Sequence, residues 1–288
     1  MFLLLLGGVI VYDYSILPNR IILCVDLRSF YASVSCIKMG LDPLHTKLAV
    51  VGDVNRNGSI VLAATPPLKA MGVKKLARLY EIPQEKDILI VNPIMGTYIK
   101  CSNYITKLAL QYVPIEDFHQ YSIDEFFMDI TDSIHLFARN SNEFALQFKR
   151  EIYEHTRIEC TIGIAPNLLM SKVVLDIEAK KNKDGVAYWT YEDIPTKLWS
   201  IRPLSKFWRI SHKTETKLNQ KGVHSIGEGE EQISLFDNII QREKEIKLMK
   251  VMDEIRTKFG KNSILRGISY TNNATARYRN TLLGGHKA

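Results

Sequence analysis

The chain has 288 residues, of which 46% are hydrophobic, and its 38 Lys and Arg outnumber its 31 Asp and Glu, giving a formal net charge of +7. This length is enough for a substantial core and about two domains. The cysteines lie far apart and form no Cys-x-x-Cys pair, which argues against a disulfide framework and a structural zinc site. The composition agrees with a cytoplasmic protein that handles nucleic acid, but it does not establish one.

An apolar run opens the chain, from Phe2 to Val11. It is too short to span a bilayer, and it lacks the basic start and the small-residue cleavage site of a signal peptide. We interpret it as an extra strand or as the product of a spurious upstream start, and we expect no membrane partner.

The first strand with a chemical signal is predicted over 21–27, where a β-rich run ends at Asp26. Ser29 follows as the predicted N-cap of a helix over 29–38 that carries Phe30 and Tyr31. A buried strand therefore delivers one carboxylate at its end.

Further strands are predicted near 47–52 and 59–64, and then a helix near 98–112 that Val113-Pro114 closes. The next strand is predicted over 121–130, and the adjacent acids Asp124 and Glu125 interrupt its apolar run.

Asp-Glu pairs usually lie in solvated turns. Inside an apolar run, however, an unpaired carboxylate costs several kcal/mol, so a metal ion, a basic partner or a kink to solvent is required. Neighbouring strand residues face opposite sides, so Asp124 and Glu125 can serve one site only if the strand bends there. With Asp26 they would make three mutually repelling carboxylates, which one or two Mg²⁺ ions would hold ionised. Two-metal phosphoryl transfer uses such an arrangement.

The rest of the chain alternates in the same way, with helices predicted near 142–156 and 167–181 and strands near 160–165 and 185–189. This order predicts an α/β (α+β) fold. After Trp199 the chain becomes helical and basic. From Ile255 to Ala288 it has seven basic residues and no acidic ones, a composition that suits phosphate contact or a solvated disordered end.

Two segments resemble the signature pair of the Y-family translesion DNA polymerases: Val25-Asp26-Leu27-Arg28-Ser29-Phe30-Tyr31-Ala32-Ser33 and Tyr121-Ser122-Ile123-Asp124-Glu125-Phe126-Phe127-Met128-Asp129-Ile130. The branch is similar to the UmuC-like UV-damage repair proteins of Gram-positive bacteria. The resemblance implies that Asp26, Asp124 and Glu125, with the Leu27 carbonyl as a further ligand, hold two Mg²⁺ ions, for which Mn²⁺ is an alternative.

The resemblance also implies that Tyr31 is a steric gate that rejects ribonucleotides, whereas the residues alone leave a helix-core aromatic equally open. Arg28 departs from the commonest family pattern, which has an acid or a small polar residue there, and its role stays open.

Two lysines are implied as nucleotide-phosphate ligands. Lys69 belongs to a segment that matches the family's fingers, and Lys180 to one that matches the palm helix. Without the motif, a solvated lysine is the alternative for each, and the spacing from Asp176 leaves Lys181 open. No Gly-x-x-x-x-Gly-Lys phosphate loop is present, which argues against an ATPase.

By the resemblance, residues 14–190 form a palm with an antiparallel-type mixed sheet, and the fingers are inserted at about 40–95. Residues 191–227 form a shortened helical thumb with a helix-hairpin-helix-like segment. In that segment Arg209 and Ser211 stand where the family hairpin usually has glycines. Because a turn that needs positive φ is strained without glycine, we discount this DNA grip.

The largest departure from the family follows Gly227, where an acidic, glycine-containing join replaces the little-finger domain. Residues 228–288 are expected to carry a clamp-binding pentapeptide and a helical basic tail. Gln232, Leu235 and Phe236 would contact the sliding clamp, although the start of an amphipathic helix is equally open.

The resemblance implies an error-prone DNA-directed DNA polymerase of the SOS response, with primer-template DNA, deoxynucleoside triphosphates and the clamp as partners. The alternative is a catalytically impaired, internally deleted remnant that acts at most as a clamp-binding protein.

Overall fold

The computed structural model describes residues 3–6, 9–12, 14, 17–74 and 76–226. A five-stranded sheet in the order β10-β9-β3-β8-β7, which we call the palm sheet, forms its centre. The middle strand β3 (Ile22–Leu27) runs antiparallel to β8 (Glu125–Asp129) and to β9 (Cys160–Ala165). At the edges, β7 (Phe118–Gln120) pairs antiparallel with β8, and β10 (Val186–Tyr188) pairs parallel with β9. The mixed α/β fold is therefore as predicted.

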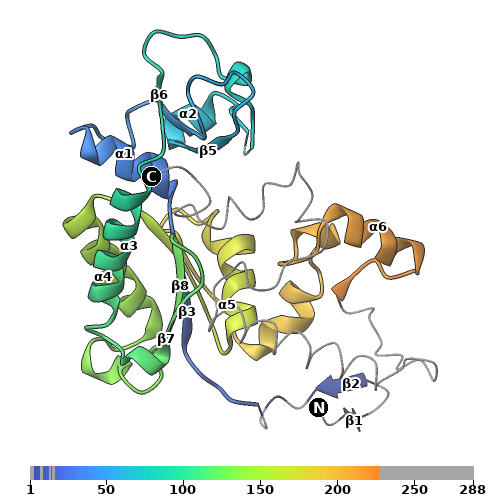
Figure 1. Cartoon of the computed structure of the whole chain (residues 1–288). Helices are drawn as coiled ribbons and strands as arrows, with labels where there is room; N and C mark the ends of the chain where they lie inside the picture. The colour runs from blue at the N-terminus through green and yellow to red at the C-terminus, as the bar shows by residue number, and fades with distance from the viewer. Residues whose placement is uncertain (1–2, 7–8, 13, 15–16, 75, 227–288) are drawn as a thin grey trace, which may run out of the picture.

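Apart from Asp26, strand β3 is apolar because both faces of the sheet are covered. Leu23 and Val25 belong to a core shared with the helices α3 (Met95–Ala109) and α4 (Ser141–Thr156). On the other face, Cys24 packs with residues of α5 (Leu168–Val174). The helix α5 contacts β3 on this face (Figure 1). Since side chains alternate along a strand, Asp26 emerges on the same face as Cys24.

A second, smaller sheet in the order β5-β4-β6 lies at one end of the palm sheet (Figure 1). It consists of β4 (Leu48–Val51), β5 (Val61–Ala64) and β6 (Leu89–Val91), and the short helix α2 (Pro66–Ala70) follows β5. The helix α1 (Phe30–Lys38) contacts both β4 and β5 and leads directly out of β3. It thereby joins the small sheet to the end of β3 where Asp26 lies.

The segment after β10 docks on the α5 face of the palm sheet. It includes the π-helix η6 (Ile194–Leu198) and the helix α6 (His212–Gln220). Leu198 and Ile201 are buried in the α5-face core, and Trp208 meets Tyr121 edge to face at 5.8 Å. Upstream of the palm, β1 (Leu3–Leu6) pairs antiparallel with β2 (Val9–Tyr12), which agrees with the extra-strand interpretation of the opening apolar run.

The prediction of one strand over 121–130 is wrong in its first part. The strand β8 begins at Glu125, and the backbone amides of Tyr121 and Ser122 both donate to the Glu125 carbonyl. This closes a turn between β7 and β8, so the predicted bend at Asp124 and Glu125 is confirmed. In a regular strand the two adjacent carboxylates would point to opposite faces, and one of them would enter the apolar core. A pair of adjacent acids inside an apolar run therefore indicates a turn.

The predicted helix over 167–181 also changes character along its length. It begins as α5 and continues as the π-helix η4 (Leu175–Ala179). A π-turn accommodates one extra residue in a helix and is frequent at functional sites. No helix in the described part of the chain is long and apolar enough to cross a membrane.

Candidate active site

The three predicted acids lie together where β3 ends and β8 begins. Asp26 and Glu125 are direct partners in the antiparallel pairing of these strands, so their side chains project from the same face. Asp124 immediately precedes β8, and its carbonyl accepts a hydrogen bond from the Leu27 amide at 2.8 Å. One end of the sheet therefore collects the acids that the sequence places about a hundred residues apart.

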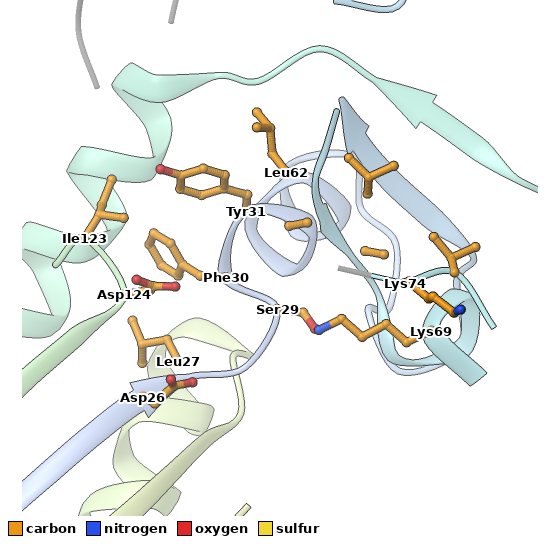
Figure 2. A pocket seen from close by; sticks show the side chains of 14 residues that line it. Asp26, Leu27, Ser29, Phe30, Tyr31, Leu62, Lys69, Lys74, Ile123 and Asp124 are labelled. Atoms are coloured by element: carbon orange, nitrogen blue, oxygen red, sulfur yellow. The ribbon is translucent and has the colours of Figure 1, made fainter. Parts of the chain in front are cut away.

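A hollow of about 350 Å³ lies between this end of the palm sheet and the small sheet (Figure 2). Asp26 and Asp124 line its palm side, and Lys69 and Lys74 line it from the other side, as Figure 2 shows. Tyr31 forms part of the wall between the acids and the small sheet. An acidic side and a basic side thus face one space, which suits a ligand that carries phosphate together with a cation. The sequence analysis missed Lys74.

Tyr31 is held by a second tyrosine. Its ring stacks on that of Tyr98 with centroids 4.4 Å apart and planes 9° apart, and Tyr98 is fully buried. The Tyr98 hydroxyl in turn shares a 2.8 Å hydrogen bond with the Ser35 hydroxyl. Burial and the nearby charge of Asp124 raise the pKa of Tyr31, so the phenol stays neutral. The hollow therefore has a flat, fixed aromatic wall.

Ser29 is not the side-chain N-cap that the sequence predicts. It stands at the cap position of α1, but its φ of 51° is left-handed and its side chain makes no capping hydrogen bond. A cap residue normally has extended backbone, which directs its oxygen to the first helical amides. The Ser29 hydroxyl instead accepts from the Lys69 ammonium at 2.7 Å. This bond ties α2 to the end of β3 and holds Lys69 at the hollow (Figure 2).

Glu125 is turned into the protein and is neutralised there. Its two carboxylate oxygens lie 2.9 and 3.0 Å from the ammonium of Lys172. The Cys24 thiol donates to the same carboxylate at 3.4 Å, and burial together with the charge of Glu125 raises the pKa of Cys24, so the thiol keeps its proton. The sequence analysis missed Lys172, although its spacing of four residues from Asp176 puts the two on one helix face.

Asp26 is also bound by a lysine, because Lys180 lies 2.9 Å from its Oδ2 and 2.8 Å from Asp176 Oδ1. The other oxygen of Asp176 lies 3.1 Å from Lys172. Five charges of alternating sign therefore form one chain, which we name the ion chain: Glu125, Lys172, Asp176, Lys180 and Asp26. Of the two lysines left open by the sequence, Lys180 is the one whose ammonium lies at Asp26.

The ion chain sets the protonation of its members. Burial raises the pKa of Asp26, a shift that Lys180 opposes and Asp124 increases. Burial acts against the charged form of Lys180, but the carboxylates of Asp26 and Asp176 outweigh it and raise the pKa of Lys180. Burial also disfavours ionised Asp176, yet Lys180 and Lys172 hold its pKa below the ordinary value.

The donor atoms suit a hard divalent cation, because Mg²⁺ prefers carboxylate and carbonyl oxygens. Asp26 and Asp124 offer such oxygens to one hollow, and Glu125 stands at the paired strand position. Within the described residues, however, no three His, Cys, Asp or Glu side chains gather closely enough to hold a metal ion. Glu125 faces Lys172 instead. The assignment of Asp26, Leu27, Asp124 and Glu125 as metal ligands therefore stays a prediction.

Arg28 pairs with an acid other than Asp26, because its guanidinium lies 2.6 Å from the carboxylate of Glu159. Both residues line a second hollow, of about 670 Å³, that adjoins the first at Asp26 and Lys69. The cations on its wall outnumber the acids: Arg28, Lys69, Lys149, Lys180 and Lys183 against Asp26, Glu159 and Asp184. We call this second space the basic hollow.

Backbone strain was expected at Arg209 and Ser211 of the thumb-like hairpin, and it is found at one of them. Arg209 has a φ of 67°, the left-handed conformation for which glycine is best suited. Ser211, by contrast, has an ordinary φ of −81° and caps α6 by accepting from the Thr214 amide. The predicted clamp-binding residues Gln232, Leu235 and Phe236 and the basic tail lie outside the described residues.

Comparison with known proteins gives a family match and several longer relatives. The model of the impB/mucB/samB family matches residues 25–176. UvrX of Bacillus subtilis (strain 168), named as a UV-damage repair protein, is 48% identical over 217 residues, which cover 75% of this chain and 51% of UvrX. DNA polymerase IV 2 of the same organism is 35% identical over 214 residues, covering 73% of this chain and 50% of that protein. The chain thus spans about half the length of these relatives.

Solved structures agree on the fold. The crystal structure of DinB from Sulfolobus solfataricus has a TM-score of 0.61 at 22% identity, covering 84% of this chain and 69% of that one. A ternary complex of Dbh has a TM-score of 0.62 at 22% identity, covering 84% and 68%.

Proposed function

Because this chain belongs to the impB/mucB/samB family of Y-family DNA polymerases, we propose that it is an error-prone DNA-directed DNA polymerase acting in the repair of UV-damaged DNA. The observation that carries this proposal is that Asp26 and Asp124, the ring of Tyr31 and Lys69 line one hollow. Such a lining suits a nucleoside triphosphate, in which the reacting α-phosphate lies between the sugar and the outer phosphates: the acids would hold cations at the α-phosphate, the aromatic ring would face the sugar, and the lysine would face the outer phosphates.

In the proposed reaction, the 3′-hydroxyl oxygen of the primer attacks the α-phosphorus of the nucleotide and pyrophosphate leaves. Asp26, Asp124 and Glu125 would hold two Mg²⁺ ions, which supply activation of the hydroxyl and charge neutralisation on the phosphates. Lys69 and Lys180, which line the basic hollow, would bind the triphosphate and stabilise the charge of the leaving pyrophosphate.

Tyr31 would set the sugar selectivity. Its ring is fixed by the stack on Tyr98 and cannot easily move aside, so a 2′-hydroxyl would meet a rigid wall. An incoming deoxyribonucleotide lacks that oxygen. We therefore propose that Tyr31 excludes ribonucleotides by shape.

The proposed partners are primer-template DNA, deoxynucleoside triphosphates and the sliding clamp. We propose residues 14–190 as palm, with fingers at about 40–95, and 191–227 as a shortened thumb. Residues 228–288 would supply the clamp-binding segment and a basic tail, without a little finger. Because DNA contact would then rest on scattered basic residues, we expect weak, strongly salt-dependent binding in the absence of the clamp.

Primer extension by the purified chain, with and without clamp, tests the proposal. Asp124→Ala should abolish extension, because it removes an acid of the hollow, whereas Asp132→Ala, which removes an exposed acid beyond the opposite end of β8, should leave it unchanged. Extension that survives Asp124→Ala would refute the assignment.

A non-catalytic remnant that only binds the clamp is the second candidate, and the left-handed Arg209 at the position of a DNA grip favours it. If the chain is such a remnant, the purified protein should show no primer extension under any condition but should still bind the clamp. That binding should disappear when Leu235→Ala and Phe236→Ala are combined.

A further inference from the structure

The ammonium of Lys180 lies between two carboxylates at the boundary of two spaces. It is 2.9 Å from Asp26 Oδ2, which lines the first hollow, and 2.8 Å from Asp176. Lys180 itself lines the basic hollow, and 38% of its side chain is exposed. It therefore has room to move into the basic hollow.

A divalent cation bound to Asp26 would compete with this ammonium. Both are positive and both need the same carboxylate, so each makes the other's binding less favourable. The cation must therefore either displace Lys180 or bind an Asp26 carboxylate whose negative charge Lys180 already partly neutralises.

The displaced lysine has a defined place to go. Asp176 lies one helical turn before Lys180 and, on its other side, contacts the buried Lys172. Because Asp176 is held in this way, it can retain the Lys180 ammonium after Asp26 releases it. The ammonium would then face the basic hollow, where Lys69, Lys149 and Lys183 already favour a polyanion.

We propose that Lys180 couples cation binding at Asp26 to nucleotide binding in the basic hollow. A divalent cation frees the ammonium from Asp26, and the freed ammonium takes a phosphate of the nucleotide. Each ligand then raises the affinity for the other, since such coupling is reciprocal. The inference rests on the proposed function in one respect, namely that Asp26 is a cation ligand.

Titration of the full chain with Mn²⁺, followed through the electron paramagnetic resonance signal of free Mn²⁺, tests this without any turnover. In the absence of nucleotide, Lys180→Met should bind Mn²⁺ about tenfold more tightly than the unchanged chain, a coupling of ordinary size. Lys183→Met is the matched control, because it removes the same charge from the basic hollow at a residue that makes no ion pair with the described residues. It should change the affinity less than twofold, and Asp26→Asn should greatly weaken binding.

A nucleotide should then have a smaller effect on Mn²⁺ binding by the variant. Adding a deoxynucleoside triphosphate should tighten Mn²⁺ binding by the unchanged chain more than by Lys180→Met. Because Mn²⁺ and nucleotide form the same complex in solution in both titrations, the difference between the two chains reports the coupling. Lys180→Gln, with folding checked by circular dichroism, repeats the test with a polar replacement.

The outcomes separate the two proposals. If Mn²⁺ binding depends on Asp26 but Lys180→Met and Lys180→Gln bind as the unchanged chain does, the coupling is refuted and the proposed function stands. If Lys183→Met tightens binding as much as Lys180→Met, the effect is general electrostatics and the coupling is again refuted. If Asp26→Asn has no effect on Mn²⁺ binding, the assignment of the cation site fails, and the coupling fails with it.

Discussion

The end of the palm sheet and the hairpin before α6 are both candidates for contact with substrate, yet they are built in different ways. At the palm end, Asp26 and Glu125 have fixed partners, and the ion chain ties them to a buried helix face. At the hairpin, Arg209 is held in a left-handed conformation, and α6, which follows, has no buried residue. The proposed nucleotide site is thus tied down by ion pairs, whereas the proposed DNA grip is strained.

The largest expected effect comes from removing the buried cation of the ion chain. Lys172→Met leaves Glu125 buried beside a neutral side chain, since the two side chains are only 7% and 10% exposed. Breaking a buried pair in this way costs about 3–5 kcal/mol. We expect a loss of that size in the free energy of unfolding, measured with urea.

Two controls accompany that measurement. Lys181→Met, at an exposed position of the same segment, should change stability by less than about 0.5 kcal/mol. Combining Lys172→Met with Glu125→Gln removes both charges and should recover part of the loss. Equal stability of Lys172→Met and the unchanged chain would show that the ion chain does not organise the palm end.

The next effect concerns the aromatic wall of the site. In an active chain, Tyr31→Ala should raise the use of ribonucleotides relative to deoxyribonucleotides by about 10- to 100-fold in kcat/KM, because shape alone separates substrates that differ by one hydroxyl. Tyr98→Leu removes the ring on which Tyr31 stacks and should produce a smaller change in the same direction. Unchanged selectivity in an active Tyr31→Ala variant would make Tyr31 an ordinary core aromatic.

The same contrast explains what the sequence could predict. The strands carrying Asp26 and Cys160 are apolar on both faces, so their composition reveals them, and the two adjacent acids reveal the bend at Asp124. Lys172 could not be identified as the partner of Glu125, because a lysine buried against an acid from a distant strand looks in sequence like any helix lysine.

Ser29 stands at the predicted N-cap position, but the sequence did not reveal that its backbone is left-handed and that its side chain makes no capping hydrogen bond. The register of Lys180 depended on the π-turn, which composition does not signal. Sequence therefore predicted the positions of the acids, and tertiary structure decided which cations meet them.

The smallest effect isolates the strain at the hairpin. Arg209→Gly and Arg209→Ala both remove the guanidinium, which lies 4.7 Å over the ring of Trp208, so both lose the same cation–π contact. Only glycine adopts a φ of 67° without a steric cost, which is about 1–2 kcal/mol for a residue with a Cβ. Since glycine also loses more backbone entropy on folding, we expect the Gly variant to be more stable than the Ala variant by about 1 kcal/mol in urea unfolding.

In the same pair of variants, DNA binding at low salt should be at least as tight for the Gly variant, because an unstrained turn can approach a phosphate more closely. A less stable Gly variant would mean that the hairpin tolerates a side chain at no cost, and the contrast between a nucleotide site tied down by ion pairs and a strained DNA grip would then be lost.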